Sequence, residues 1–302
     1  MNIQNMKFNA DYSPKIVVVG SCSIDLVLNT SRMPQANQTI LADRSQSFFG
    51  GKGANQAVAT SRLGASVYFI GAIGADPHGQ QICRNFREEN INYGFLVEKP
   101  ASSTGTAFVI ASEGKNAITV VPAANNLLSP KDIDAAEKVI SEADLVLTQL
   151  EIPLETIEYL YKKCEKLKVK IAIYAAPGQK LPQNIIDQSE FIIAKTCDLG
   201  AIFGPESREQ IMKSLPNKLF VRDDTNSTIY FNGSEMSYYR NDPAQTAHKM
   251  GMGDAFTSGF AIAYCHKNQI KDCVKFGNDV SLKVAENRGS QSGLPFLKNV
   301  LV

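Results

Sequence analysis

The chain has 302 residues, of which 44% are hydrophobic and 20% charged, and its formal net charge is +1. This composition is ordinary for a soluble globular protein, and the small charge gives no support for nucleic acid or a membrane surface as partner. No apolar run approaches the roughly 18 residues needed to span a bilayer. The polar start lacks the apolar core of a secretory signal. Six scattered cysteines without a C-x-x-C pair indicate reduced thiols in a cytoplasmic protein.

Short β-branched runs alternate with helical stretches along most of the chain. The predicted strands are Lys15–Gly20, Val67–Ile73, Leu145–Gln149, Lys170–Tyr174, Glu190–Ala194 and Lys218–Val221. The predicted helices are Gly53–Leu63, Gln80–Glu89, Pro130–Glu142, Leu154–Leu167, Asp254–Cys265 and Lys271–Glu286. This alternation predicts an α/β fold with a mainly parallel central sheet between two layers of helices.

Two stretches interrupt the alternation. Asp25–Phe48 and Thr104–Pro122 alternate apolar and polar residues with no helix between, which is typical of antiparallel strands outside the main sheet. We expect these segments, about residues 25–48 and 104–122, to form a small lid sheet inserted within a single α/β domain of residues 14–302.

The first glycine-rich turn offers several groups to a polyhydroxyl ligand. Gly51 and its neighbouring glycines allow close backbone approach, Lys52 supplies donors, and Asn55 supplies both a donor and an acceptor. Asp25 follows the first strand, at the edge of an open sheet where ligands bind, and its carboxylate suits a vicinal diol. A turn-capping role for Asp25 is the alternative. The spacing of a Walker phosphate loop is absent.

The second glycine-rich turn, Gly251-Met252-Gly253-Asp254, precedes a predicted helix. Backbone amides at a helix start can bind the charge that develops on a transferring phosphoryl group. Asp254 would then accept the proton of an attacking hydroxyl. The alternative is a simple N-cap, in which Asp254 stabilises only the helix start.

The string GGKGANQA, residues 50–57, matches the signature of the ribokinase (PfkB-type) family of sugar kinases residue for residue. With the second turn, the resemblance covers about residues 14–298. It implies a ribokinase-like three-layer α/β/α sandwich with a β-sheet lid, and ATP-dependent phosphorylation of a sugar hydroxyl with Mg²⁺. It also implies a homodimer formed through the lid. Lys52 favours a free sugar, because related nucleoside kinases usually lack this lysine. The resemblance to ribokinases implies that a pentose is preferred.

The same resemblance assigns roles to other segments. It implies that Glu151 touches the sugar and that Asn278 borders the adenine. The turn Gly74–Gly79 resembles the family's G-x-D-x-x-G element, which we interpret as structural, and Ala123–Asn125 also resembles the family. Residues Arg288–Pro295 resemble the last loop, beside the nucleotide and a monovalent-cation site.

The sugar half matches the family closely, with Ser23 in place of an asparagine, whereas the nucleotide half departs at four places. Tyr174-Ala175 stand where relatives carry Asn-Pro. The family's N-x-x-E element reads Lys195 to Asp198. The T-x-G-x-x-G strand end reads Arg222 to Ser227, without glycines. His248-Lys249 replace an Asp-Thr pair, which removes a carboxylate from the cation site.

We expect the altered positions still to face the nucleotide. The predicted cofactor-binding residues are Lys195, Asp198, Arg222, Asp224, Gly253 and Asn278, with Asp198 as the candidate Mg²⁺ ligand. The added carboxylates would disfavour a triphosphate unless a metal ion or Arg222 compensates for them.

Two alternatives to an active ATP-dependent kinase stay open. The first is a pseudokinase that binds a sugar or sugar phosphate as a sensor or partner subunit, because the changes cluster in the nucleotide half. The second is a kinase with another phosphoryl donor, such as pyrophosphate. A dinucleotide oxidoreductase is disfavoured because Gly20-Ser21-Cys22-Ser23 lacks the G-x-G-x-x-G pattern.

Overall fold

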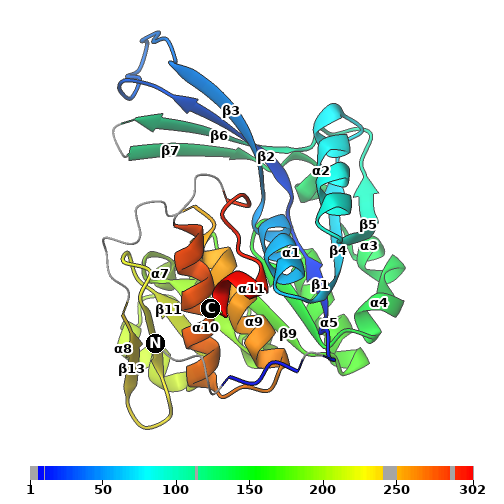
Figure 1. The fold of residues 1–302 in the computed structure, drawn as a ribbon, viewed down its shortest axis with the longest axis vertical. Helices are drawn as coiled ribbons and strands as arrows, with labels where there is room; N and C mark the ends of the chain where they lie inside the picture. Colours follow the sequence, from blue (N-terminus) through cyan, green and yellow to red (C-terminus); the bar gives the residue numbers. More distant parts are fainter. Residues whose placement is uncertain (1–5, 10, 113–114, 241–249, 286–289, 302) are drawn as a thin grey trace.

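The computed structural model describes residues 6–9, 11–112, 115–240, 250–285 and 290–301. These residues form a large sheet covered by helices on both faces and a second, smaller sheet that projects from one edge (Figure 1). Within the described part of the chain, no helix is long and apolar enough to cross a membrane.

The large sheet has the strand order β13-β12-β11-β10-β9-β8-β1-β4-β5. Its strands are β1 (Lys15–Val19), β4 (Ser66–Ile73), β5 (Asn92–Glu98), β8 (Leu145–Gln149), β9 (Ile171–Tyr174), β10 (Ile192–Lys195), β11 (Leu219–Arg222), β12 (Thr228–Phe231) and β13 (Met236–Tyr239). All pairings from β5 to β11 are parallel, which confirms the predicted mainly parallel sheet. The β-branched runs are buried because helices cover both faces.

Three strands escaped the sequence analysis. β5 carries polar residues at an edge of the sheet, and β12 and β13 are short strands that pair antiparallel at the other edge. The β12–β13 turn is closed by Asn232, whose side chain accepts hydrogen bonds from the amides of Ser234 and Glu235. Such an Asn-Gly turn is a hairpin signal that the sequence does contain.

The helices divide between the two faces of the large sheet. One face packs against α1 (Lys52–Arg62), α2 (Pro77–Glu88), α9 (Met252–Cys265), α10 (Ile270–Val284) and α11 (Leu297–Val300). The other packs against α3 (Pro130–Ala135), α4 (Glu137–Ser141), α5 (Leu154–Leu167), α6 (Gln183–Gln188), α7 (Leu199–Phe203) and α8 (Arg208–Ser214), with the short 3-10 helices η1 (Ala123–Leu127) and η2 (Thr196–Asp198) nearby. The single helix predicted over Pro130–Glu142 was wrong, because Ala136 leaves the helical conformation and separates α3 from α4.

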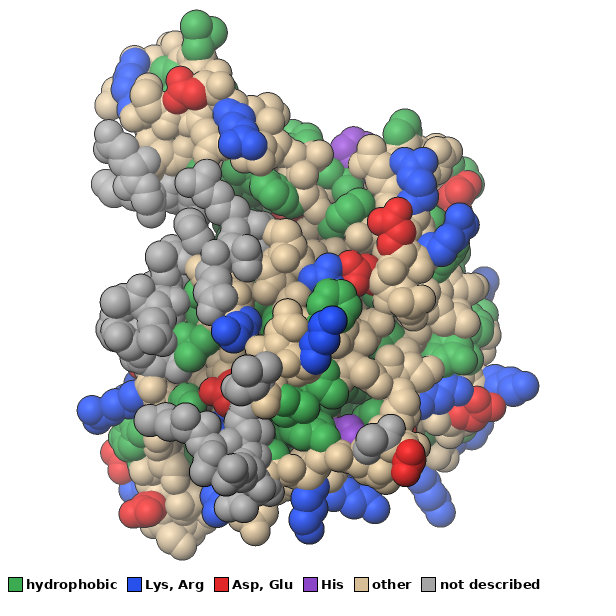
Figure 2. All heavy atoms as spheres, in the orientation of Figure 1, with side chains coloured by type: hydrophobic (Ala, Val, Ile, Leu, Met, Phe, Trp, Pro, Cys, Tyr) green, Lys and Arg blue, Asp and Glu red, His purple; other side chains and the backbone are tan. Residues whose placement is uncertain are grey.

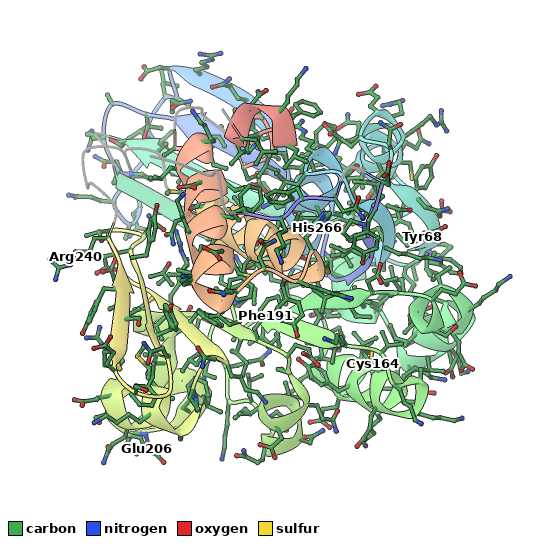
Figure 3. The ribbon with its side chains drawn as sticks, turned by 60° about the horizontal axis from the view of Figure 1, so that its bottom comes forward. Tyr68, Cys164, Phe191, Glu206, Arg240 and His266 are labelled. Carbon is green, nitrogen blue, oxygen red and sulfur yellow. The ribbon has the colours of Figure 1, made fainter. Side chains whose placement is uncertain are left out.

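Each face has its own apolar core. Phe191 belongs to the core beneath α9, where its ring lies 4.6 Å from that of Phe260, whereas Cys164 of α5 belongs to the core of the opposite face (Figure 3). Two separate cores hold the sheet rigidly between its helix layers, so the strand ends form a fixed base for a site.

The small sheet is the predicted lid, with the strand order β3-β2-β6-β7. Its strands are β2 (Ser23–Asn29), β3 (Arg44–Gly50), β6 (Gly105–Ser112) and β7 (Lys115–Val121). The lid stands out from the body of the molecule as a separate lobe (Figure 2). The prediction of purely antiparallel strands was wrong for one pair, since β2 and β6 run parallel. Both leave the same carboxyl edge of the large sheet, after β1 and β5, and therefore run in one direction.

The turn Gly74–Gly79 fastens the lid to the large sheet. Asp76 caps α2 through the amide of Gly79 and also accepts hydrogen bonds from the amide and hydroxyl of Thr104, just before β6. These contacts support the structural interpretation of the turn.

A second contact holds the lid where β2 begins. The side-chain amide of Asn125 accepts a hydrogen bond from the Cys22 amide and donates one to the Cys22 carbonyl.

Candidate functional site

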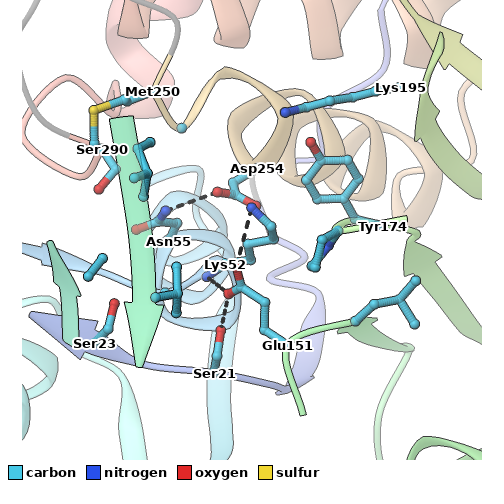
Figure 4. Close-up of a pocket in the computed structure, with 18 of the residues that line it drawn as sticks. Ser21, Ser23, Lys52, Asn55, Glu151, Tyr174, Lys195, Met250, Asp254 and Ser290 are labelled. Carbon is cyan, nitrogen blue, oxygen red and sulfur yellow. Dashed lines mark hydrogen bonds and ion pairs between the residues drawn. The ribbon is translucent and has the colours of Figure 1, made fainter. Parts of the chain in front are cut away.

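A cavity of about 800 Å³ lies between the carboxyl edge of the large sheet and the inner face of the lid (Figure 4). Its wall includes the side chains of Asp25, Lys52, Asn55, Glu151 and Asp254, all predicted from the sequence. Apolar lid residues complete it: Ala107, Val109, Ile118 and Val120. The loops at the carboxyl ends of parallel strands meet here, which is where ligands bind in open α/β sheets.

Lys52 and Glu151 form a compact ion pair at the start of α1. The Lys52 ammonium lies 3.4 Å from a Glu151 carboxylate oxygen, and the Lys52 amide donates to that carboxylate at 3.0 Å. The Ser21 hydroxyl donates to the same carboxylate at 2.5 Å. Burial lowers the pKa of Lys52, but the negative charges of Glu151 and Asp254 raise it by more. Lys52 is therefore charged at every working pH. Glu151 holds the Lys52 ammonium in place and also faces the cavity.

Gly51 makes this arrangement sterically feasible. Its backbone has φ +87°, a conformation that L side chains rarely adopt, and a Cβ there would lie 2.6 Å from the Cα of Cys22. The glycine thus brings the first turn of α1 against the end of β1, as its position in the motif predicts.

Asp254 is the most buried carboxylate of the cavity wall. It accepts a hydrogen bond from the Asn55 side chain at 2.9 Å and another from the Gln56 side chain at 3.3 Å. Burial raises the pKa of Asp254 to about 6, although Lys52 and the two amides oppose the shift. A carboxylate with this pKa is ionised near neutral pH and basic enough to accept a proton.

A chain of side-chain amides continues from Asp254 in both directions, and the sequence analysis missed it. On one side Gln149 donates to Gln56 at 2.7 Å, and on the other Gln291 donates to Asn55 at 3.1 Å. Asn85 donates in turn to Gln291 at 3.0 Å. Gln56 lies within GGKGANQA and could have been recognised, whereas Gln149 and Gln291 join the site only through the tertiary fold.

Asp25 lies on β2 where the lid meets the large sheet. Its carboxylate covers Gly50, at which a Cβ would lie 2.1 Å from a carboxylate oxygen, and it accepts a hydrogen bond from the Ser23 hydroxyl at 3.1 Å. Burial raises the pKa of Asp25 to about 6, against the effect of the Ser23 hydrogen bond. The group faces the cavity and does not cap a turn, so the capping alternative is disfavoured.

The turn from Gly251 to Asp254 forms the start of α9. Gly251 has φ +78°, and a Cβ there would lie 2.8 Å from the carbonyl oxygen of Ser290. No side chain caps this helix end, and the amides of its first turn have no partner within the helix. Met252 is buried in the core, so it could contribute to an anion site only through its amide.

Arg222 lies in the cavity wall, but its guanidinium forms hydrogen bonds with buried residues behind the wall. Its guanidinium donates to Thr228 at 3.1 Å, Asn278 at 2.9 Å and Ser281 at 2.9 Å, and stacks 4.3 Å from the ring centre of Phe256. Burial lowers the pKa of Arg222 to about 9.

Asn278 is fully buried and is not part of the cavity wall. The contact between Asn278 and a nucleotide stays a prediction, and in this structure the Asn278 side chain supports Arg222 from behind.

The role of Asp198 as a Mg²⁺ ligand also stays a prediction. Asp198 packs against Gly178, where a Cβ would lie 2.7 Å from the Asp198 Cβ, and it is outside the cavity wall. Among the described residues, no group of three His, Cys, Asp or Glu side chains could hold a metal ion. Lys195 and Asp224, in contrast, do line the cavity.

The turn after β11 keeps its tight conformation although it lacks the two glycines of the T-x-G-x-x-G element. Asp223 accepts hydrogen bonds from the amides of Thr225 and Ser227, at 2.9 and 3.0 Å, and so closes the turn from inside. Asn226 takes the left-handed conformation, with φ 57°, which asparagine tolerates better than most residues. His248, Lys249, Arg288 and Gly289 lie outside the described residues.

Comparison with known proteins agrees with this geometry. Residues 13–297 match the model of the pfkB family of carbohydrate kinases. The chain is 32% identical over 280 residues to the ribokinase of Bacillus subtilis, a match that covers 93% of this chain and 96% of the relative. It is also 32% identical over 287 residues to the ribokinase of Lactococcus lactis, covering 95% of both.

Solved structures share the fold. The ribokinase of Arabidopsis thaliana, complexed with ribose and ATP, has a TM-score of 0.84 and 26% identity, with 96% of this chain and 98% of that chain covered. The ribokinase of Thermotoga maritima gives a TM-score of 0.84 at 25% identity, with the same coverage.

Proposed function

This chain belongs to the pfkB family of carbohydrate kinases, and we propose that it transfers the γ-phosphoryl group of ATP to the 5-hydroxymethyl group of a pentose, with ribose the first candidate. The observation that carries the proposal is the buried Asp254, held by Asn55 and Gln56 at the start of α9. Relatives that are ribokinases, one of them solved with ribose and ATP, support the choice of sugar and donor.

The transfer needs a base and an anion site side by side. The sugar oxygen attacks the γ-phosphorus, its proton passes to the Asp254 carboxylate, and the bond to the bridging oxygen breaks to release ADP. The amides of Gly251, Met252 and Gly253 stabilise charge on the transferring group. Because Asp254 belongs to the same helix turn, the base and the anion site have a fixed separation.

The sugar is held by the groups that surround the first glycine-rich turn. Asp25 accepts from two neighbouring hydroxyls, and Asn55 and Lys52 supply donors. The backbone of Gly51 permits close approach, and Glu151 completes the polar wall. The apolar lid residues cover the opposite face of the ring, which excludes water from the transfer.

The adenine nucleotide occupies the other half of the cavity, towards Lys195, Arg222 and Asp224. Mg²⁺ would neutralise phosphate charge; the described residues contain no group of three His, Cys, Asp or Glu side chains that could hold it without the phosphates, and the mechanism above routes no step through it. Mg²⁺ commonly enters such sites on the substrate phosphates and keeps several waters.

The lid is proposed to pair with a second copy of the chain. Its outer face carries the exposed side chains of Leu28, Phe108 and Val121, while the inner face closes on the cavity. An apolar face on a projecting sheet favours pairing with an identical sheet. Light scattering of the purified protein, with Phe108→Glu as the disrupting variant, tests this state.

The test of the function is a coupled assay of ADP release with Mg·ATP and a panel of pentoses and hexoses. Asp254→Asn should lower turnover by at least about 100-fold, whereas Asp187→Asn, an exposed change on α6, should not. Sugar-independent ADP release, or equal rates with both variants, would refute the proposal.

A second candidate is a pseudokinase that binds the sugar without turnover. The contacts of Arg222 favour this candidate, because its guanidinium donates to Thr228, Asn278 and Ser281 and so has fewer N–H groups left for a nucleotide. Calorimetry separates the two: the kinase binds both ribose and Mg·ATP, while the pseudokinase binds ribose alone.

A further inference from the structure

Tyr174 ends strand β9 at the cavity, between Gln149 of β8 and Ile193 of β10. Its side chain is 2% exposed and belongs to the cavity wall. Figure 4 shows the ring beside Lys52 and Asp254, and the Lys52 ammonium lies 5.9 Å from the ring centre. A tyrosine here therefore adds a polar atom to the centre of the site.

The hydroxyl of Tyr174 points at the first turn of α9. A Cβ on Gly253 would lie 2.2 Å from the Tyr174 oxygen, so the phenol occupies the space that any side chain at residue 253 would take. An anion seated on the amides of Gly251–Gly253 lies within reach of the same hydroxyl. Gly253 therefore leaves room for the Tyr174 hydroxyl, in addition to allowing close approach to its own backbone.

The hydroxyl forms no hydrogen bond with any residue that the structure describes. Fully enclosed polar atoms without a partner in the described part of the chain are found on His78, Thr148, Gln149, Gln188 and Arg222. The Tyr174 oxygen is not one of them, so it opens to the cavity. A donor that faces a cavity without a protein partner is available to a ligand.

We propose that the Tyr174 hydroxyl donates a hydrogen bond to the phosphoryl group as it passes from ATP to the sugar, as an added member of the anion site. The inference rests on the proposed kinase function. Burial raises the pKa of Tyr174, against the opposing effect of Lys52, so the phenol stays protonated and remains a donor throughout the working pH range.

The test is Tyr174→Phe, which removes the donor and keeps the ring. We expect kcat/KM for Mg·ATP to fall by about 10²- to 10³-fold, the range for loss of one such donor. Affinity for the unreactive analogue AMP-PNP should fall, while affinity for AMP and for ribose stays unchanged by calorimetry. Tyr238→Phe, a change on an exposed tyrosine of β13, should behave as the unaltered protein.

The outcomes separate this inference from the proposed function. If the unaltered protein turns over and Tyr174→Phe is within twofold of it or faster, the inference is overturned and the kinase function stands. If neither turns over, the kinase function fails, and titration with inorganic phosphate decides the inference. At least fivefold weaker phosphate binding by Tyr174→Phe would support it, and equal or absent binding would overturn it.

Discussion

The side-chain amide of Asn55 donates a 2.9 Å hydrogen bond to Asp254, although 199 residues separate the two in the chain. The contact joins the first turns of α1 and α9 and fixes the base relative to the sugar-binding turn. The contact buries a carboxylate that has no cation in ion-pair contact among the described residues, an arrangement that costs stability and favours a functional role.

Asp254→Asn should lower kcat by about 10²- to 10⁴-fold, the usual contribution of a positioned general base. The amide keeps the shape of the carboxylate but accepts no proton. Ribose affinity should change little, because Asn55 and Lys52 remain. Steady-state kinetics with parallel calorimetry measures both. A variant that loses ribose affinity and turnover together would mean that Asp254 acts mainly in sugar binding.

The pH profile of kcat/KM should show an acidic limb near pH 6, since burial raises the pKa of Asp254 to about 6 and only the carboxylate is basic. Gln56→Met removes one donor that stabilises the carboxylate. Loss of this donor should raise the pKa of Asp254, so the acidic limb of the kcat/KM profile should move to higher pH by about one unit. Gln80→Met on the exposed face of α2 is the matched control. An unmoved limb would show that Asp254 does not set it.

Asp254→Asn should also stabilise the fold at neutral pH. The ordinary pKa of the carboxyl is 3.8 and the folded value is raised, so between about pH 4 and 6 the folded state binds more protons than the unfolded state. The contribution of the Asp254 carboxyl to the free energy of unfolding is therefore greatest below about pH 4 and is lost as the pH rises to about 6. The asparagine side chain of the variant does not ionise and loses no stability in this way. The free energy of unfolding of Asp254→Asn should therefore exceed that of the unaltered protein by about 1–3 kcal/mol at pH 7.5.

Urea unfolding of both proteins at pH 7.5 and pH 4.5 measures that advantage. It should shrink at the lower pH, where the native carboxyl is protonated. An advantage that is equal at both pH values would show that the ionisation of Asp254 is not its cause.

Asn278→Ala should lower the free energy of unfolding by about 2–3 kcal/mol, because it removes an acceptor from a buried guanidinium. Arg222 has no carboxylate in ion-pair contact among the residues described, so it depends on Asn278, Thr228 and Ser281. Denaturant titration measures the loss, with the exposed Asn299→Ala as control. A loss below 0.5 kcal/mol, the scale of ordinary surface changes, would show that Asn278 does not support Arg222.

Local patterns in the sequence determined most of the fold. Buried parallel strands read as short β-branched runs, and the glycines of the two motifs predicted close backbone approach, which Gly51 and Gly251 adopt with positive φ. The sugar-side residues were predictable because one short string contains Lys52 and Asn55, and because strand ends of a parallel sheet meet at one edge.

Only the tertiary structure decided how distant groups combine. The amide chain through Gln149 and Gln291, the inward turn of Arg222 onto Asn278, and the approach of Tyr174 to Gly253 all join segments far apart in the chain. Such contacts depend on the packing of helices and strand ends in three dimensions, which a local pattern does not encode. The direction in which a side chain points from a strand end decides whether it binds a ligand or supports the wall behind it.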